Sequence, residues 1–335
     1  MQNVRILPRG CDVNAAPALA SEIGKLSAWA RIVESRYPVS APLFVAEKGG
    51  EVFGVCMGYF HRSGGPASTL YVPRFATIAR DGATEKAVLV AIGDHARMQG
   101  LRRSVVAYDK ASLGEYFCWK KTTVTLTLVS DSDVMFAALR AKSRNTVRRA
   151  AEVFEVLIDQ NYLDEFYQAY AARMEGKGLA THPIEFFQSL FAGAADCELM
   201  VARRAGVIEA GMIWRQSNQT AHYLFNAATS EGLRNNANHL LMWEAMRHYS
   251  ARRVEILDLG ESSPNGGVYA FKTVQFGGVP MEVRYADILC GAGAERSAAP
   301  LPWHFRLATR IGGVLPISLD RRLELAKQGY GRLLW

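Results

Sequence analysis

One lysine of this 335-residue chain stands in a setting that could do chemistry. Lys272 lies in a short aromatic segment, residues 269–276, which follows a buried-strand pattern at residues 254–259 and a polar, Gly-rich loop. Rigid scaffolds usually present functional groups on loops that follow strands. An ammonium group that aromatic rings partly desolvate interacts more strongly with a bound anion. The alternative is a lysine whose stem packs on the aromatic rings while its head reaches water.

A basic stripe is the second candidate. Residues 134–153 follow a helical pattern, and residues 130–133 supply several candidate N-caps. Within this predicted helix Arg140, Arg144 and Arg148 recur every four residues, so they share one face. Such a face suits the phosphates of tRNA or of a nucleotide-sugar carrier. A solvated basic helix face is the equally common alternative, and both interpretations stay open.

Composition predicts an ordinary globular protein. The length suggests two domains, and 49% of the residues are hydrophobic, which is enough for sizeable cores. The five cysteines have neither metal-ligand nor redox spacing, which is typical of reduced thiols in a cytosolic protein. The N-terminus lacks a signal-peptide pattern, and no apolar run reaches the roughly 20 residues of a spanning helix. We therefore expect a cytoplasmic protein without a metal site or a tightly bound cofactor.

The C-terminal tail carries most of the net charge of +7. From Arg296 to Trp335, seven Lys and Arg face only Asp320 and Glu324, and aromatic residues such as Trp303 lie among them. Basic residues beside aromatics suit the headgroup region of a membrane, which predicts peripheral contact at the inner face of the membrane. The alternative is a tail that packs back on the protein, because Gly312-Gly313 and Pro316 would break a single long amphipathic helix.

Hydrophobic periodicity predicts alternating strands and helices. Helices are expected at residues 14–37, 83–99, 113–120, 134–153, 163–175, 184–191 and 238–249. Strands are expected at residues 43–47, 52–60, 69–78, 104–108, 122–129, 198–204, 208–216, 220–227, 254–260 and 281–289. Residues 44–54 resemble residues 200–210 at an offset of 156, and the same offset places helix 83–99 on helix 238–249. This favours a duplicated unit.

Three motifs in order resemble those of the Fem-like family of peptidyl and acyl transferases. The motifs are Arg144-Asn145-x-Val147-Arg148-Arg149-Ala150, Asn238-His239-Leu240-Leu241-Met242-Trp243-Glu244, and Asp258-x-Gly260 with Gly267-x-Tyr269-x-Phe271-Lys272-x-x-x-Phe276-Gly277. The resemblance spans roughly residues 136–290 and is closest to the subgroup linked to exopolysaccharide and exosortase systems. It implies an α/β (α+β) fold of two tandem acetyltransferase-type (GNAT) units, each a mixed, mostly antiparallel sheet flanked by helices. We place the units at residues 1–130 and 131–294, and the basic tail at residues 295–335.

The resemblance also implies roles for individual residues. Lys272 is the predicted catalytic group, which stabilises the oxyanion, and Tyr269 and Phe271 hold it in place. Asp258 is the second predicted catalytic residue, although substrate or water could equally take the proton. Tyr223 resembles a family tyrosine that contacts the acceptor, and a tyrosine packed in the sheet with its hydroxyl at the rim is the alternative. The predicted substrate-binding residues are Tyr223, Tyr269, Phe271, Arg144, Arg148 and Asn238.

The expected function is transfer of an acyl or aminoacyl group to an amine or hydroxyl of a cell-envelope precursor, either peptidoglycan or exopolysaccharide. The donor is aminoacyl-tRNA or acyl-CoA, and an N-acetyltransferase using acyl-CoA is the alternative. The Gly-rich turn that cradles coenzyme A pyrophosphate in simple GNAT enzymes is missing at residues 234–239, and residues 80–83 hold one glycine beside Asp81. His182 and Glu261 stand where some relatives carry arginine. A non-catalytic scaffold protein at the membrane surface is the competing class.

Overall fold

The computed structural model describes residues 3–8, 11, 13–61, 68–177, 179, 181–193 and 196–291. The chain forms two compact units. Unit 1 contains Met1–Lys121, Gly193–Ala195 and Val283–Trp335, and unit 2 contains Thr122–Ala192 and Asp196–Glu282. The predicted tail at residues 295–335 lies outside the described residues.

Unit 1 has its helices packed on a central hairpin. Its elements are β1 (Asn3–Ile6), α1 (Pro17–Arg36), β2 (Val39–Ser40), β3 (Leu43–Lys48), β4 (Glu51–Met57), β5 (Tyr59–His61), β6 (Thr69–Val72), β7 (Thr77–Ala79), α2 (Gly82–Met98) and β8 (Arg103–Tyr108). Its strand orders are β1-β3-β4-β7 and β15-β8-β6-β5-β2, where β15 is Val279–Gly291. Helix α1 packs on β4, and α2 packs on β3 and β4. The apolar stripe of α1 buries Trp29, whose indole N–H donates to the Tyr59 hydroxyl at 2.6 Å.

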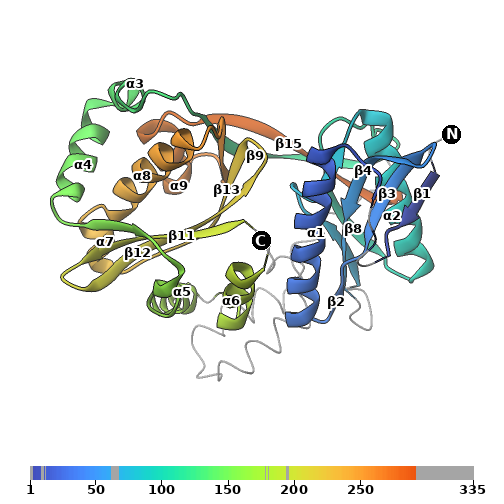
Figure 1. The fold of residues 1–335 in the computed structure, drawn as a ribbon, viewed down its shortest axis with the longest axis horizontal. Helices are drawn as coiled ribbons and strands as arrows, with labels where there is room; N and C mark the ends of the chain where they lie inside the picture. Colours follow the sequence, from blue (N-terminus) through green and yellow to red (C-terminus); the bar gives the residue numbers. More distant parts are fainter. Residues whose placement is uncertain are drawn as a thin grey trace. The chain divides into compact units, whose positions relative to one another are not determined.

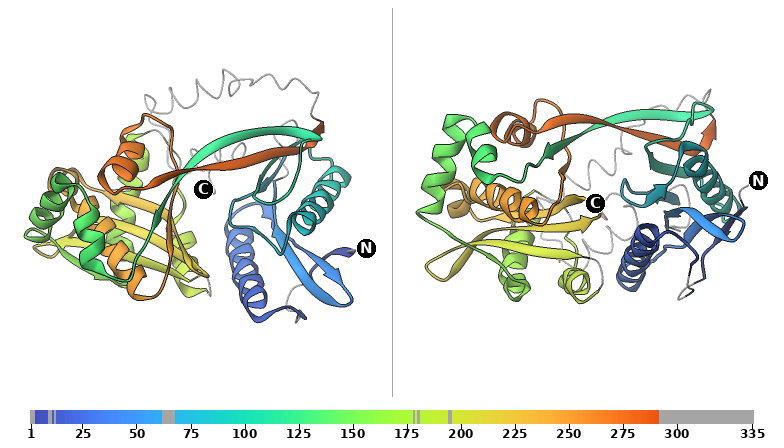
Figure 2. Two further views of the ribbon diagram at one scale, coloured as in Figure 1. Left: turned by 90° about the horizontal axis from the view of Figure 1, so that it is seen from above. Right: turned by 45° about the horizontal axis from the view of Figure 1, so that its top comes forward.

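Unit 2 has helices on both faces of its sheet (Figures 1 and 2). Its helices are α3 (Ser132–Ala138), α4 (Ala141–Ala151), η1 (Gln160–Tyr162), α5 (Leu163–Gly176), α6 (Ile184–Ala192), α7 (Ser230–Arg234), α8 (Ala237–Ala251), α9 (Gly267–Ala270) and the π-helical turn η2 (Phe271–Gln275). Its strands are β10 (Glu155–Ile158), β11 (Cys197–Arg204), β12 (Val207–Ser217), β13 (Thr220–Ala228) and β14 (Ile256–Glu261), and the sheet order is β10-β11-β12-β13-β14-β9.

Two hydrophobic layers hold unit 2 together. One core lies under α4 and α8 and contains Trp214, Leu241, Trp243 and Leu257. On the other face an aromatic cluster joins α5 and α6 to Phe225 of β13, with ring centroids 5.1–6.2 Å apart. Figure 1 shows α4 and α8 on one face of this sheet and α5 on the other. This layering accounts for the near-continuous apolar pattern of β11 and β12, because strands buried on both faces need it.

Two long strands contribute to both units. β9 (Tyr116–Thr127) changes unit after Lys121, and β15 (Val279–Gly291) changes after Glu282. β9 pairs with β14 through residues 123–127, and β15 pairs with β8 through Arg284–Ala286. The division we placed at residues 130/131 therefore differs from the compact units, because strand 122–127 completes the sheet of unit 2. The end of β15 likewise completes a sheet of unit 1.

The helix expected at residues 113–120 is wrong. β9 begins at Tyr116, and only a turn precedes it, with the Tyr116 N–H donating to the Leu113 carbonyl at 3.0 Å. Aromatic residues favour strands because they pack well on a pleated surface. Here the Trp119 ring stacks on the Tyr285 ring of β15, with centroids 5.7 Å apart.

The single helix expected at residues 134–153 is also wrong. α3 ends at Ala138, and Leu139 and Arg140 have extended backbone before α4 starts at Ala141. The Arg144 guanidinium donates to the Ala137 carbonyl at 2.9 Å and to the Leu139 carbonyl. It therefore satisfies carbonyls that the end of α3 leaves without helical partners. Arg140 consequently lies outside the helix that carries Arg144 and Arg148.

Candidate active site

The site forms where two parallel strands of unit 2 stop pairing. β13 and β14 pair only from Thr220↔Ile256 to His222↔Asp258, although β13 continues to Ala228. An irregularity in the β12–β13 register lies next to this point, between Ile213 and Trp214. Bulges of this kind bend a strand and raise its twist. Beyond His222 the second half of β13 continues without pairing to β14 among the described residues.

Lys272 reaches this point from η2. Its side chain is buried, with 4% of the residue exposed. Its ammonium group donates to the Gly260 carbonyl at 3.0 Å and to the Ser262 hydroxyl at 2.8 Å. The Nζ atom also lies 6.0 Å from the centroid of the Tyr223 ring. Both of these hydrogen-bond acceptors are uncharged oxygens, and they orient the ammonium group.

The segment that carries Lys272 is closed by two glycines. Gly277 adopts φ +75°, and its N–H donates to the Thr273 carbonyl at 3.0 Å. The Gly278 N–H donates to the Lys272 carbonyl at 2.9 Å, and a Cβ at Gly278 would lie 2.7 Å from that oxygen. Only glycine fits so close an approach. The glycines that follow Phe276 thus fix the backbone position of Lys272.

Asp258 lies beneath the same loop. Its Oδ1 atom accepts from the Thr123 hydroxyl at 2.9 Å and from the Gly260 N–H at 2.9 Å. Its Oδ2 atom lies 3.6 Å from Nδ1 of His222. The residue is 7% exposed. The structure therefore links both predicted catalytic residues through Gly260, with Asp258 on its N–H and Lys272 on its carbonyl.

The aromatic residues predicted to surround Lys272 belong to the core beside it. Tyr223, Tyr269 and Phe271 pack against the core under α8. Burial raises the pKa of Tyr223, whose ring centroid lies 5.1 Å from that of Trp214. The Tyr269 carbonyl accepts from the Thr273 hydroxyl at 2.8 Å, which stabilises the turn around Lys272.

Two further residues of α8 support this segment. His239 contacts the Phe271 ring with centroids 5.0 Å apart and is hydrogen-bonded to Gln275. Burial lowers the pKa of His239, and the hydrogen bond with Gln275 opposes this shift. Asn238 accepts from Nδ2 of Asn226 at 3.0 Å, so it ties the start of α8 to β13. His239 belongs to the motif that begins at Asn238, but no role was predicted for it from the sequence. Its partner Gln275 is 36 positions away in the sequence, so only the fold reveals this contact.

The two predicted phosphate-contacting arginines have different environments. Arg144 is half-buried and donates to the end of α3, as described above. Arg148 is exposed, and its guanidinium lies 5.1 Å from the centroid of the Phe136 ring. Arg148 and Arg149 also sit in the last turn of α4, where basic side chains complement the helix dipole. Arg148 is thus available to a ligand, whereas Arg144 already has a structural task.

The turn before α8 carries carboxylates in place of the missing glycines. Helix α7 occupies it, and Glu231 accepts from Arg204 at 3.2 Å, from Asn235 at 3.1 Å and from Arg234. In unit 1 a carboxylate occupies the corresponding turn, because Asp81 accepts a hydrogen bond from the Thr84 N–H at 2.8 Å. The Glu85 carboxylate accepts three backbone N–H groups of residues 109–111. In unit 1 the Asp81 carboxylate thus occupies the helix N-terminus where a phosphate would bind, whereas in unit 2 the Glu231 charge is matched by Arg204 and Arg234.

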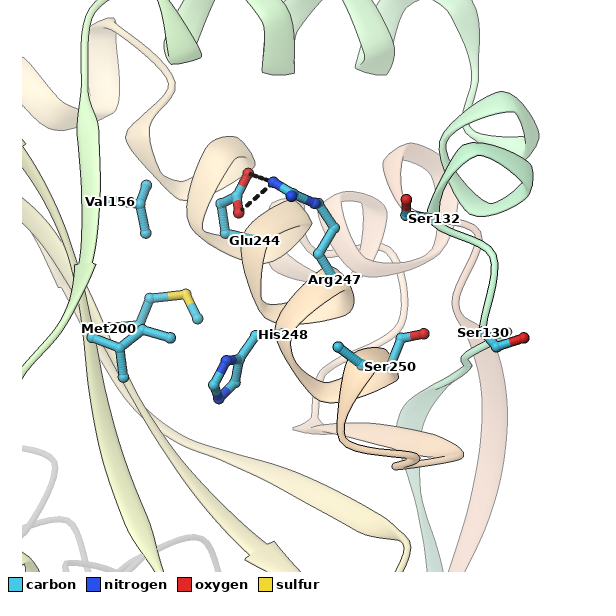
Figure 3. Close-up of a pocket in the computed structure, with 10 residues that line it drawn as sticks. Ser130, Ser132, Val156, Met200, Glu244, Arg247, His248 and Ser250 are labelled. Atoms are coloured by element: carbon cyan, nitrogen blue, oxygen red, sulfur yellow. Dashed lines mark hydrogen bonds and ion pairs between the residues drawn. The ribbon is translucent and has the colours of Figure 1, made fainter.

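A pocket of about 390 Å³ lies at the other end of α8 (Figure 3). It is lined by Ser130, Ser132, Val156, Ile158, Met200, Glu244, Arg247, His248, Ser250 and Ala251. None of the predicted site residues is among them. Glu244 and Arg247 pair with each other at 2.9 Å, as Figure 3 shows, so their charges are already matched. We therefore assign the candidate active site to the Lys272 region and not to this pocket.

His182, which stands where some relatives carry arginine, is part of the aromatic cluster on the α5–α6 face. Its ring stacks on Phe186 with centroids 4.7 Å apart, and it is 5% exposed. Burial lowers its pKa to about 3, so the side chain is neutral near pH 7. It cannot supply the positive charge of an arginine at this position. Among the described residues there is also no group of His, Cys, Asp and Glu side chains that could hold a metal ion.

Comparisons with known proteins agree with this geometry. Residues 137–273 match the family model of the acetyltransferase (GNAT) domain. The fold is that of tandem GNAT proteins. A solved structure of FemX superposes with a TM-score of 0.62 at 14% identity, covering 81% of this chain and 96% of that chain. A tandem GNAT protein from the clavulanic acid biosynthesis pathway gives 0.53 at 12% identity, covering 86% and 99%.

A third structure is the C-terminal domain of a putative lysylphosphatidylglycerol synthetase from Agrobacterium fabrum. It gives a TM-score of 0.55 at 13% identity, covering 81% of this chain and 92% of that chain. A search of curated proteins finds no match. The predicted tandem GNAT fold is confirmed, and the match over residues 137–273 supports the predicted class of acyltransferase. In the part of the chain that the structure describes, no helix is long and apolar enough to cross a membrane.

Proposed function

We propose that unit 2 transfers an acyl or aminoacyl group and that Lys272 stabilises the oxyanion of the tetrahedral intermediate. One observation carries this proposal: a buried ammonium group is held by the Gly260 carbonyl and the Ser262 hydroxyl where β13 and β14 separate. An acceptor amine or hydroxyl would attack the donor carbonyl beside Lys272, where β13 and β14 stop pairing. Negative charge would then develop on the carbonyl oxygen, and a preoriented, buried cation stabilises it strongly. Collapse of this intermediate would break the bond from the carbonyl carbon to the tRNA hydroxyl oxygen or to the coenzyme A sulfur, and that group would leave with one proton in exchange for the proton that the acceptor loses.

The donor is either an aminoacyl-tRNA or an acyl-CoA. The glycines that cradle a pyrophosphate are missing at residues 234–239, which supports a donor whose phosphates bind elsewhere. The exposed Arg148 is a candidate contact for such phosphates. The match with the acetyltransferase family supports the second candidate donor, acyl-CoA.

The proposed acceptor is a precursor of the cell envelope, with the exopolysaccharide-linked subgroup as its finer placement. Two structural neighbours, FemX and the lysylphosphatidylglycerol synthetase domain, support a cell-envelope molecule as the acceptor of the aminoacyl group. The name lysylphosphatidylglycerol synthetase refers to a phospholipid that carries a lysyl group. This name supports a location of the present protein at the membrane surface. We propose that the basic tail supplies this contact from the cytoplasmic side.

A donor screen with a lysine variant tests the proposal. The full chain is incubated with charged tRNA or with acyl-CoA, and transfer to amine acceptors is followed by mass spectrometry. Lys272→Met should lower the rate on the order of 100-fold or more with either accepted donor. Lys110→Met is the matched control, because Lys110 also donates to a backbone carbonyl, that of Ala79 at 2.7 Å in unit 1. Full activity of Lys272→Met would refute the proposed role.

A further inference from the structure

We propose that Asp258 is a positioning residue that sets the place of the Lys272 ammonium group, and that Thr123 of β9 fixes Asp258 for this task. The proposal rests on the function proposed above, because it explains how that function's key cation is held. It assigns Asp258 a task other than that of proton acceptor. One chain of hydrogen bonds within unit 2 connects these residues.

The chain of contacts runs from β9 to the ammonium group. The Thr123 hydroxyl and the Gly260 N–H both donate to Oδ1 of Asp258, each at 2.9 Å. The carbonyl of the same glycine accepts from the Lys272 Nζ atom at 3.0 Å. A single residue therefore separates the carboxylate from the ammonium group, and a shift of Gly260 would be passed directly to Lys272.

Gly260 needs such a restraint because of its backbone. It adopts φ +76°, in the left-handed region, and glycine populates many other conformations at little cost. The hydrogen bond from the Gly260 N–H to the aspartate two residues earlier is an Asx-type turn, which selects one of these conformations. The β14–β9 register is irregular between Asp258 and Glu261. Bulges of this kind re-aim groups beside active sites.

The surroundings of Asp258 suit a positioning role better than proton transfer. Two donors occupy its Oδ1 atom, and Oδ2 faces Nδ1 of His222 at 3.6 Å. The residue is 7% exposed. A general base must come within hydrogen-bond reach of the proton that it takes. The carboxylate is instead directed at groups of the protein, and its link to the reacting atoms passes through Gly260 and Lys272.

Unit 1 contains a matched arrangement without the lysine. Oδ1 of Asp287 accepts from the Ser104 hydroxyl at 2.5 Å and from the Leu289 N–H at 3.1 Å. Leu289 lies two residues after Asp287, as Gly260 lies two residues after Asp258. Substitutions at Asp287 therefore control for the loss of a buried, hydrogen-bonded aspartate on its own.

Two pairs of variants of the full chain separate positioning from proton transfer. Asp258→Asn keeps an oxygen acceptor and removes the basic carboxylate, whereas Asp258→Ala removes both. Thr123→Ser keeps the hydroxyl that Thr123→Val removes. We expect Thr123→Ser to keep most of its kcat and Asp258→Asn to lose less kcat than Asp258→Ala, because both conservative variants keep the group that makes the hydrogen bonds. Asp258→Ala should lose roughly 10- to 100-fold in kcat, as for a lost hydrogen bond from a charged group, with little change in KM.

The second readout does not depend on activity. Reductive methylation followed by peptide mass spectrometry measures how fast Lys272 is modified, and the exposed Lys142 is the internal reference. Lys272 should be modified slowly in wild type and Asp258→Asn, and faster in Asp258→Ala and Thr123→Val. Asp287→Ala should leave the rate at Lys272 unchanged. If Asp258→Ala does not fold, Thr123→Val makes the same comparison.

The outcomes distinguish this proposal from the proposed function. Asp258→Asn as inactive as Lys272→Met, with Lys272 still protected from methylation, would make Asp258 the proton acceptor and overturn the proposal. Equal methylation of Lys272 in all variants would overturn it as well. If Lys272→Met is fully active while methylation follows the Asp258 series, the proposed function fails and the positioning role stands.

Discussion

Substitution of Gly260 by alanine isolates the backbone on which the site depends. A Cβ at this position would meet only the Tyr223 carbonyl oxygen, at 3.8 Å, which is ordinary van der Waals contact. The substitution therefore acts through conformation and not through a clash. Holding an L-residue at φ +76° costs about 1–2 kcal/mol. We expect Gly260→Ala to lower the free energy of unfolding by about this amount.

The same substitution should lower activity further. Alanine relieves its strain by leaving the left-handed region, and this movement takes the Gly260 carbonyl away from the Lys272 Nζ atom. A hydrogen bond from a charged donor contributes about 1.5–3 kcal/mol. If that energy is lost from the transition state, kcat falls roughly 10- to 150-fold. Transfer assays with the donor found in the screen, together with urea unfolding, measure the two effects separately.

Gly100 provides the matched control. It adopts φ +74° after α2 in unit 1, and an added Cβ would meet nothing within 4 Å. Gly100→Ala should therefore lose about the same 1–2 kcal/mol of stability and keep its kcat. Equal stability losses with wild-type kcat in both variants would show that the Gly260 carbonyl does not set the position of Lys272.

Three further predictions concern other parts of the chain. Arg148→Glu should weaken binding of tRNA at low salt, with a difference from wild type that shrinks as salt rises, and unchanged binding would make this helix face merely solvated. Burial raises the pKa of Glu198, but the hydrogen bond with His248 and the charges of His248 and Arg252 outweigh it and lower the pKa to about 2. The stability that wild type holds over Glu198→Gln should thus be full above about pH 4.5 and vanish toward about pH 2 in denaturant titrations, whereas a pH-independent difference would contradict this. The full chain should float with anionic liposomes and a chain ending at Ala299 should not, and equal behaviour of the two would exclude the tail as a membrane contact.

Local patterns predicted most of the elements. The hairpin of β3 and β4 follows from alternation around Gly49-Gly50, and α2 follows from its apolar stripe. The prediction of a single helix at residues 134–153 was wrong, and no local sequence pattern shows the reason. The break in the helix depends on an arginine, Arg144, that satisfies carbonyls one turn upstream. Helical spacing alone makes the same arginine one of an exposed stripe.

The part of the candidate site whose residues are close together in the sequence could be predicted. Contacts between residues far apart in the sequence could not. Lys272, Gly260 and Ser262 lie in one short stretch, so the stretch could be singled out before its hydrogen bonds were known. Thr123 is 135 positions from Asp258, and the two meet only because β9 pairs with β14. The sequence marks Thr123 as one of several alternating threonines in a strand. Sheet pairing is what turns one of them into a partner of the site.

Two aspartates that share part of their hydrogen-bond pattern support the proposed placement of the chemistry in unit 2. Asp258 and Asp287 each accept a side-chain hydroxyl and the N–H group two residues later. Around Asp287 the pattern ends in the continuing strand β15. After Asp258 the chain leaves the sheet, turns through the loop at residues 262–266 and returns as α9 and η2 with Lys272. A buried aspartate at a strand is thus a backbone device in both units, and the lysine that returns to it makes the second unit the candidate catalyst.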